Sequence, residues 1–514
     1  MKHVMILGAG IMQIPALEIA REMGWKTFCV DRDADAPAVP LCDHFLPIDL
    51  KDRVGLAKAA IAYKEKYGLD GVMTVGTDFS PSVAWVAEKA GLPGIPFQTA
   101  LDASDKVRMR AKFEEAGLPS PGYIEMSPEM GPLTPLETLS FPLVVKPVDN
   151  MGARGVRRVD NEAELIEAIG KAITFSRSDR AIVEEFLEGD EFSIDALVYN
   201  GKVEIYGIAD RHIYFPPYFI EMGHTIPSIA DEETLRVIIE TFKEAVKAVG
   251  IENGAAKGDI KFSRGKAWIG EIAARLSGGF MSGWTYPYCS GRSAVREALK
   301  ICTGMEPDFN VKVEDRYTAE RAFISIPGKI GSLENLETAH KMQLVKDLFI
   351  LKDEGDEVDF PRNNVEKVGN VIASGKDRTR AVNAAERAAR SIFVRLERNN
   401  PKTAEYLGSL EEFPPAAFSE KSEALTKLAE QYGPADFANL PFDEWEAVQV
   451  PKDIISPDAA DWQGRKVSEV FKTVTGEFKL EKGEASLFSY YFWTALLRGS
   501  LQGATWFLES IKEK

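Results

Sequence analysis

Short apolar runs alternate with amphipathic segments over residues 1–95, and this order most constrains what the chain can fold into. The apolar runs predict strands, and the segments between them predict helices. The strands are expected at 3–7, 26–31 and 71–75, and the helices at 15–23, 51–67 and 81–90. Strands that alternate with helices form a parallel sheet with helices on both faces. The stretch after residue 31 is rich in Asp, Ala and Pro and predicts a loop. We therefore predict an α/β domain at the N-terminus.

The first predicted strand ends in Gly8-Ala9-Gly10, for which two interpretations compete. A dinucleotide-binding turn requires a third glycine, but Gln13 stands at that position. Asp31, at the end of the second strand, would suit a ribose. We favour a tight turn that needs only small residues, with an anionic ligand at the helix N-terminus as the alternative.

Composition excludes several classes of function. The 514 residues include 62 Lys and Arg against 79 Asp and Glu, a formal net charge of −17, so a main role in nucleic-acid or membrane binding is not expected. The four cysteines lie far apart and predict neither a disulfide framework nor a zinc cluster. No signal-peptide pattern opens the chain, and the apolar run at 487–497 is too short to span a bilayer. These features favour a cytoplasmic protein.

Downstream of residue 95 the pattern changes from alternation to hairpins. Asn200-Gly201 separates two strand patterns, at 192–199 and 202–208, and is the strongest hairpin signal in the chain. A second hairpin is predicted for 257–262 and 267–272. Further strands are expected at 141–147 and 181–186, and further helices at 102–117, 232–249, 293–303 and 382–395. This part of the chain is therefore predicted to be α+β.

Two segments carry residues suited to a nucleotide. Lys146 ends a predicted strand directly before a glycine-containing loop, where a lysine can hold a phosphate while backbone N–H groups close over it. In the segment 183–191, a strand end exposes backbone groups that can pair with an adenine edge, and a later carboxylate can accept ribose hydroxyls. The alternatives are a solvated lysine and an exposed acidic loop.

The second predicted hairpin carries residues suited to a metal ion. Asp259 and Glu271 lie on its two strands, so that both carboxylates can face one hard cation such as Mg²⁺, which takes few protein carboxylates plus substrate phosphates. Arg275 follows four residues after Glu271, where its guanidinium could hold an anionic oxygen at two points. The alternative is an edge hairpin with surface ion pairs, which contribute little stability.

Taken in order, these segments resemble the ATP-grasp superfamily of carboxylate–amine ligases. The resemblance covers residues 4–396. Its first specific motif is Val75-Gly76-Thr77-Asp78-Phe79-Ser80 in the N-terminal domain, and the segment 103–121 looks like the linker helix of the superfamily. Segment 321–376 is similar to the closing domain of the subgroup that contains L-amino-acid ligases. The resemblance implies an N-terminal Rossmann-like domain (1–98), an ATP-grasp nucleotide-binding domain (99–305, with a lid at about 120–195) and a mixed α/β closing domain (306–400). Residues 401–514 are predicted to be an additional, aromatic-rich and mostly helical extension.

The resemblance also implies a site, residue by residue. The side chains implied to contact ATP phosphates are Lys106 and Lys146, under a loop that includes Gly152, Ala153, Arg154 and Gly155. The implied adenine hinge is Glu184, Glu185, Phe186 and Leu187, and the implied ribose carboxylate is Glu191. Asp259 and Glu271 would ligate Mg²⁺, or Mn²⁺ in its place. Arg275 would steady the transferred phosphoryl group, with Lys146 as the second catalytic residue.

Two positions depart from the commonest pattern of the superfamily. Ala273 replaces the asparagine that ligates a second metal ion, and Lys257 stands where many relatives carry histidine. These departures leave open how a second Mg²⁺ would be held.

The implied activity is an ATP-dependent coupling of a small carboxylate to an amine through an acyl phosphate. His224 and Arg292 are the candidate substrate contacts, each with a structural role as the alternative. The other functions considered are activation of bicarbonate or formate, a purine-biosynthesis-like reaction, and nucleotide binding without catalysis. The first two are weakened because Leu276-Ser277-Gly278-Gly279 lacks the His-Asn run of those relatives.

Residues 401–514 lie beyond the resemblance and hold four of the eight tryptophans, which favours a folded segment. Residues 486–512 predict one or two helices, broken near Gly499 or Gly503, with a broad aromatic surface that must be covered. Packing onto the rest of the chain is the favoured interpretation, and a homo-oligomer interface is the alternative.

Overall fold

The computed structural model describes residues 1–418, 422–438, 458–479 and 489–512. The chain forms two compact units, which are treated separately below. Unit 1 comprises Met1–Ala319 and Ser374–Arg378, and unit 2 comprises Glu320–Ala373 and Thr379–Lys514. Within the described residues, no helix is both long enough and apolar enough to cross a membrane.

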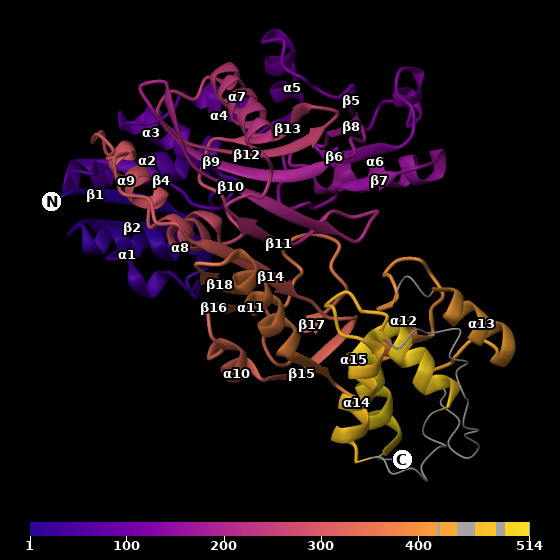
Figure 1. The fold of residues 1–514 in the computed structure, drawn as a ribbon. Coiled ribbons are helices and arrows are strands. Elements are labelled where there is room, and N and C mark those ends of the chain that lie inside the picture. The colour runs from indigo at the N-terminus through magenta and orange to yellow at the C-terminus, as the bar shows by residue number, and fades with distance from the viewer. Residues whose placement is uncertain (419–421, 439–457, 480–488, 513–514) are drawn as a thin grey trace. The chain divides into compact units, whose positions relative to one another are not determined.

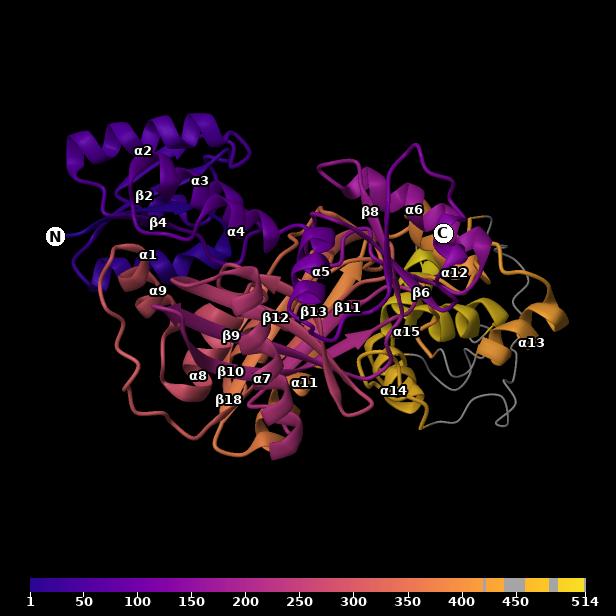
Figure 2. The ribbon, with the colours of Figure 1, turned by 90° about the horizontal axis from the view of Figure 1, so that it is seen from above.

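Unit 1 begins with the predicted parallel sheet, which is confirmed. Its strands are β1 (His3–Leu7), β2 (Lys26–Asp31), β3 (His44–Pro47) and β4 (Gly71–Met73), in the order β3-β2-β1-β4, and every pairing is parallel. Helices α1 (Ile14–Glu22), α2 (Arg53–Tyr67) and α3 (Ser80–Ala90) cover the sheet. Side chains of β1 alternate between two cores, Val4 and Ile6 toward α1, Met5 and Leu7 toward α2 and α3. Figure 2 shows α1 and α2 on opposite faces of these strands.

Two predictions for this region are wrong in detail. Strand β3 lies inside the stretch that was expected to be a loop. The helix expected over 102–117 is α5 (Lys106–Glu115), which begins four residues later than predicted, and a separate short helix, α4 (Phe97–Asp102), precedes it. The two helices are separate because Asp105 has an extended backbone and caps α5, its carboxylate accepting from the N–H groups of Val107 and Arg108 at 2.9 and 3.1 Å.

Two antiparallel sheets follow in unit 1. The smaller has strands β5 (Tyr123–Met126), β6 (Leu143–Pro147), β7 (Arg157–Val159) and β8 (Ala181–Glu185), in the order β5-β8-β6-β7, with α6 (Glu162–Phe175) packed on it. The larger includes β9 (Asp190–Tyr199), β10 (Lys202–Tyr214), β11 (Ile220–Ile226), β12 (Gly254–Ser263) and β13 (Lys266–Ala273), in the order β13-β12-β9-β10-β11. Both predicted hairpins, β9–β10 and β12–β13, are confirmed. Helix α7 (Glu232–Val249) lies against β12 and β13, and α8 (Tyr286–Ser290) and α9 (Ala294–Cys302) follow (Figure 1).

Unit 2 contains the rest of the strands and the C-terminal helices. Its strands are β14 (Tyr317–Phe323) and β18 (Gly369–Gly375), which both extend into unit 1, with β15 (Gly328–Glu334), β16 (Val345–Ile350), β17 (Glu357–Val358) and β19 (Phe393–Leu396). Its helices are α10 (Leu336–His340), α11 (Arg378–Ser391), α12 (Pro401–Gly408), α13 (Ser422–Tyr432), α14 (Val467–Glu477) and α15 (Tyr490–Lys512). The helix predicted at 382–395 begins and ends four residues earlier, because the apolar run at its end forms β19 and pairs with β15.

The described part of the C-terminal segment is folded and packed, as favoured from its aromatic content. Helices α12, α13 and α14 contact α15, which also contacts β19 (Figure 1). Phe492, Trp506 and Phe507 lie in one apolar core with residues of β15 and β19. The predicted break in α15 is confirmed at Ser500, whose φ of 50° and ψ of −138° are not helical. Trp445 lies outside the described residues.

Candidate active site

The β12–β13 hairpin brings the two predicted metal carboxylates face to face. Asp259 and Glu271 are cross-strand partners, and a β-bulge directly after them places Ile260 opposite Ile269, so that Gly270 is the additional residue. Without this bulge, strand alternation would put Glu271 on the same face as the buried Ile269. The bulge turns Glu271 to the face that carries Asp259, which is how a sheet re-aims one side chain beside a site.

Three cations surround this carboxylate pair. Lys106 Nζ lies 3.4 Å from Glu271 Oε2, Arg211 Nη1 lies 3.2 Å from Asp259 Oδ1, and Lys257 Nζ donates to Asp259 Oδ2. Burial alone would raise the pKa of Asp259, but the charges of Arg211 and Lys257 outweigh it and lower this pKa to about 2. Lys106 and Lys257 likewise outweigh burial and lower the pKa of Glu271. Both side chains are therefore carboxylates at neutral pH.

The donor set fits a hard divalent cation. Mg²⁺ in phosphate-transfer sites is held by one or two carboxylates and completed by substrate phosphates and water. Asp259 and Glu271 supply two such carboxylates. Among the described residues no group of three or more His, Cys, Asp and Glu side chains is placed to hold a metal ion. The two carboxylates suit a cation whose other ligands are a substrate phosphate and water.

A buried network joins Lys146 to the bulge. Lys146 Nζ donates to Glu184 Oε2 at 2.5 Å, and Arg110 Nε donates to Glu184 Oε1 at 2.7 Å. The same guanidinium donates to the carbonyls of Ile269 and Gly270 at 2.5 and 3.2 Å, and so holds the backbone next to Glu271. Burial would raise the pKa of Glu184, but Arg110 and Lys146 lower it to about 2. Burial lowers the pKa of Lys146, while Glu184 acts in the opposite direction.

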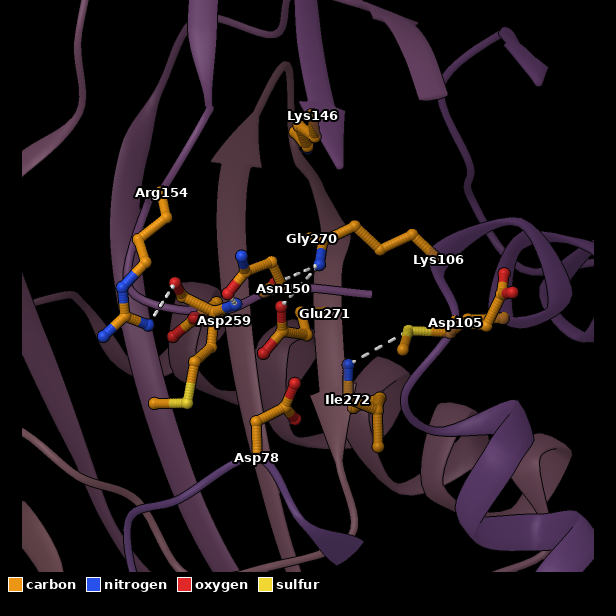
Figure 3. A network of polar contacts seen from close by, with 12 residues as sticks. Asp78, Asp105, Lys106, Lys146, Asn150, Arg154, Asp259, Gly270, Glu271 and Ile272 are labelled. Carbon is orange, nitrogen blue, oxygen red and sulfur yellow. Dashed lines mark hydrogen bonds and ion pairs between the residues drawn. The ribbon is translucent and has the colours of Figure 1, made fainter. Parts of the chain in front are cut away.

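The glycine-containing loop after Lys146 has a backbone suited to close approach. Gly152, Ala153 and Gly155 have φ values of 68°, 59° and 69°, in the left-handed region that turns successive N–H groups toward one side. Arg154 Nη1 donates to the Met151 carbonyl at 3.3 Å. Lys106 Nζ donates to the Asn150 carbonyl at 2.9 Å, so one lysine joins this loop to Glu271 (Figure 3).

Arg275 belongs to the same cluster. Its side chain is buried, Nη1 donates to the Leu276 carbonyl at 3.0 Å, and the buried Nε has no hydrogen-bond partner in the part of the chain that the structure describes. Its charge acts on Asp259 and Glu271, so it lies close to both. A buried donor without a partner is costly and is the kind of group that an anionic ligand satisfies.

Asp78 is a member of the cluster that was not predicted from the sequence. It follows β4 in a loop that is docked beside the Arg275 segment, because Val75 pairs with Leu276 and Gly76 N donates to the Leu276 carbonyl at 3.2 Å. Burial raises the pKa of Asp78, and Arg275 acts against it. In Figure 3 the Asp78 carboxylate points toward Glu271. A carboxylate directly after a predicted strand was the available signal, but only the fold shows which strand ends meet.

Arg110 and Arg211 were also not predicted as site residues. Charged residues within helical or strand patterns are usually solvated, and the sequence does not show that Arg110 is buried or that Arg211 contacts three carboxylates. Besides Asp259, Arg211 bonds Glu221 at 2.8 Å and lies 3.5 Å from Glu191.

The predicted adenine and ribose residues form a group beside the hairpin. Glu185 and Phe186 donate their backbone N–H groups to the carbonyls of Gly122 and Pro142, at 3.0 and 3.1 Å. The Phe186 ring lies 4.8 Å from Lys261 Nζ, and this lysine also bonds Glu191 at 3.0 Å. Leu187 follows Phe186 in the turn before β9. Glu184 itself points into the buried network, so it can serve the hinge only through its backbone.

The structure gives the two candidate substrate residues structural partners. His224 is fully buried, with Nε2 2.9 Å from Thr285 Oγ1. Arg292 Nη2 donates to Glu204 at 2.9 Å, and its guanidinium lies 4.2 Å from the Tyr206 ring centre. The contacts of Arg292 lie within the fold, away from the carboxylate cluster. His224 Nδ1 lies 3.8 Å from Glu221 Oε1, and Glu221 also bonds Arg211, so His224 lies one residue away from the cations around Asp259.

The Gly8-Ala9-Gly10 turn has its own structural explanation. Gln13 is buried and fills the space over Gly8, and its amide donates to the Val75 carbonyl. Asp31 Oδ2 accepts from Ala9 N at 2.9 Å. Both residues are thus used in closing the turn, which supports the tight-turn interpretation.

Comparison with known proteins gives three family matches along the chain. Residues 17–94 match the ATP-grasp N-terminal domain, residues 139–283 the ATP-grasp domain, and residues 322–397 the L-amino acid ligase C-terminal domain 2. Their order agrees with the order of elements described above.

Individual proteins that are similar to this chain include ligases of amino acids. Alanine–anticapsin ligase of Bacillus subtilis is 30% identical over 236 residues, which cover 41% of this chain and 49% of that protein. The chain spans about half the length of the curated relatives that it matches first. The crystal structure of an L-amino acid ligase from Bacillus licheniformis has a TM-score of 0.68 at 25% identity, and the match covers 77% of this chain and 99% of that one. Phosphoribosylglycinamide synthetase from Anaerococcus prevotii, with a TM-score of 0.61 at 22% identity over 77% of this chain and 100% of that one, shows the fold alone.

Proposed function

Because the chain is an ATP-grasp domain protein related to the L-amino acid ligases, we propose that it is an ATP-dependent ligase. In the proposed reaction, ATP phosphorylates a small carboxylate to an acyl phosphate, since a carboxylate itself is a poor electrophile. An amine then attacks the acyl carbon, and phosphate leaves. The products are an amide, ADP and phosphate, and the relatives support amino acids as the substrate class.

One observation carries this proposal. Lys106, Asp259, Glu271 and Arg275 come from distant parts of the sequence and meet in one cluster, and Lys146 joins it through Glu184 and Arg110. Cations arranged around two ionised carboxylates suit a phosphoryl group in transfer, whose charge is spread over several oxygens.

The side chains have separate roles in the proposed reaction. Lys146 and Lys106 hold the phosphates of ATP, and Arg275 offsets the charge on the group in transfer. The loop at 150–155 closes over them and excludes water, which would otherwise hydrolyse the acyl phosphate. Asp259 and Glu271 hold Mg²⁺, which when bound neutralises phosphate charge.

The nucleoside would lie beside the hairpin. Since the N–H groups of Glu185 and Phe186 donate within the fold, the N–H of Leu187 and the carbonyls of this hinge would read the adenine edge. Glu191 would accept the ribose hydroxyls. Lys261 and Arg211 hold Glu191 at 3.0 and 3.5 Å, which supports a fixed carboxylate at this position.

The test is to incubate the protein with Mg·ATP and mixed pools of amino acids, other carboxylates and amines. We expect ADP release that depends on both a carboxylate and an amine, and a product whose mass is their sum minus water. ADP release that requires bicarbonate or formate would favour the alternative activation reactions. Tight Mg·ATP binding without ADP release from any pool would favour a nucleotide-binding protein without turnover.

A further inference from the structure

The face of the sheet that carries the metal carboxylates also holds a lysine in an unusual position. Lys257 lies two residues before Asp259 on β12, so both side chains project from one face. Its cross-strand partner on β13 is Ala273, and its partner on β9 is Asp195. Lys257 Nζ donates to Asp259 Oδ2. The ammonium group of Lys257 therefore projects from the same face of the sheet as Asp259 and Glu271, one cross-strand pair away from them.

The small side chain of Ala273 matters here. A larger polar side chain at this position would project from the same face, directly opposite Lys257, and would compete with it for the space beside Glu271. Because residue 273 is alanine, Lys257 is the polar member of the cross-strand pair Lys257–Ala273. Lys257 and Ala273 are the two departures from the usual pattern, and they are direct neighbours across the hairpin. The small side chain at 273 therefore leaves room for the lysine at 257.

The charge around Lys257 resembles that around a metal ion. Asp259 contacts it directly, and its charge also acts on Glu271 and Asp195. Asp195 is 1% exposed and accepts from Ser277 and Ser282, while its Oδ1 has no hydrogen-bond partner among the described residues. Three carboxylates thus share one lysine, and a second divalent cation would have to displace it.

We propose that the ammonium group of Lys257 is a fixed cation that stands in for a second metal ion, so that this site takes up one divalent cation and not two. This inference rests on the proposed function for the identity of the bound nucleotide. It assigns Lys257 a role in charge compensation next to the group in transfer, in a site where Ala273 supplies no metal ligand.

The experiment counts bound Mn²⁺ in the full chain, by the electron paramagnetic resonance signal of free Mn²⁺, with and without β,γ-imido ATP. With the analogue we expect one Mn²⁺ per wild-type chain and two in Lys257→Ala/Ala273→Asn, where a ligand replaces the cation. Without the analogue, Lys257→Ala should bind its Mn²⁺ roughly tenfold more tightly, because a positive charge beside the carboxylates is removed.

Two variants serve as controls. Lys266→Ala removes the same charge from the far end of the same hairpin, where the side chain is exposed, and should leave both the number and the affinity of Mn²⁺ unchanged. Lys257→Arg keeps the charge and should still bind one Mn²⁺, and circular dichroism of each variant checks folding. Two Mn²⁺ in the wild type, or unchanged affinity in Lys257→Ala, would overturn the proposal. Absence of analogue binding would instead count against the proposed function, while the titration without nucleotide still tests Lys257.

Discussion

The β12–β13 hairpin of unit 1 and helix α15 of unit 2 bury their side chains in opposite ways. On the hairpin, Asp259 and Glu271 are compensated by Lys257 of the same hairpin and by Lys106 and Arg211 from other elements. On α15, Phe492, Trp506 and Phe507 are buried in an apolar core. Apolar burial is strongly favourable, whereas buried ion pairs repay little beyond their own desolvation. Substitutions on the hairpin should therefore change chemistry, and those on α15 should change stability.

The largest expected effect tests the hairpin. Glu271→Gln removes one charge and keeps the shape, so we expect ADP release to fall by about a thousandfold or more, as for loss of a preorganised charge in an active site. The thermal midpoint should change by only a few degrees. Steady-state ADP release and a thermal melt measure both quantities, and near-normal turnover in this variant would refute the metal assignment.

The corresponding change on α15 is Trp506→Ala. Trp506 is 2% exposed and donates to the Glu397 carbonyl at 2.9 Å. Its removal should lower the free energy of unfolding by about 4 kcal/mol, measured by urea titration, without changing nucleotide affinity. Tyr432→Ala, at a ring that is 42% exposed, is the matched control and should cost less than about 1 kcal/mol. Equal losses in the two variants would contradict the packing described for α15.

A third variant asks whether a charged residue can also be structural. Arg110→Met leaves Glu184 Oε1 and two backbone carbonyls without their buried donor, which should cost about 3 kcal/mol of unfolding free energy. Arg108→Met, on the same helix, breaks a pair with Asp102 in which the arginine is 42% exposed, and should cost under about 1 kcal/mol. Equal stability of Arg110→Met and Arg108→Met would contradict the structural role assigned to Arg110.

The smallest expected effect is a dependence on pH. The pKa of Glu184 is about 2 in the folded protein and 4.5 when unperturbed, so its charge stabilises the fold fully only above pH 4.5. This contribution is lost as pH falls toward 2, by about 2 kcal/mol between pH 5 and pH 3. Glu184→Gln should lack this component, so the difference in unfolding free energy between the two proteins should narrow on acidification. A constant difference from pH 5 to pH 3 would show that Glu184 is not held as a carboxylate.

The chemistry of the site was more predictable than its geometry. Lysine before a glycine loop and two carboxylates on one hairpin are visible in the sequence because those residue types have few other combined uses. The bulge at Gly270 is not visible, and without it Glu271 would be expected on the buried face. Asp78, Arg110 and Arg211 were missed because their roles depend on which strand ends and helix faces meet.

The fold, too, was predictable from the sequence in some parts and not in others. Strands and helices with clear periodicity, such as β2 and α7, were predicted with the observed bounds. The errors lie where one residue decides between two outcomes, as at Asp105, which caps a new helix, and at Phe393, where an apolar run becomes a strand that pairs with β15.

The central claim is that Lys106, Lys146, Asp259, Glu271 and Arg275 surround the terminal phosphate of one nucleotide. The most direct test is a crystal structure with Mn²⁺ and β,γ-imido ATP, in which anomalous scattering locates the metal. We predict an anomalous peak within bonding distance of Asp259 and Glu271, and a γ-phosphate in contact with Lys146 and Arg275. A nucleotide bound elsewhere, or a metal that contacts neither carboxylate, would contradict the account.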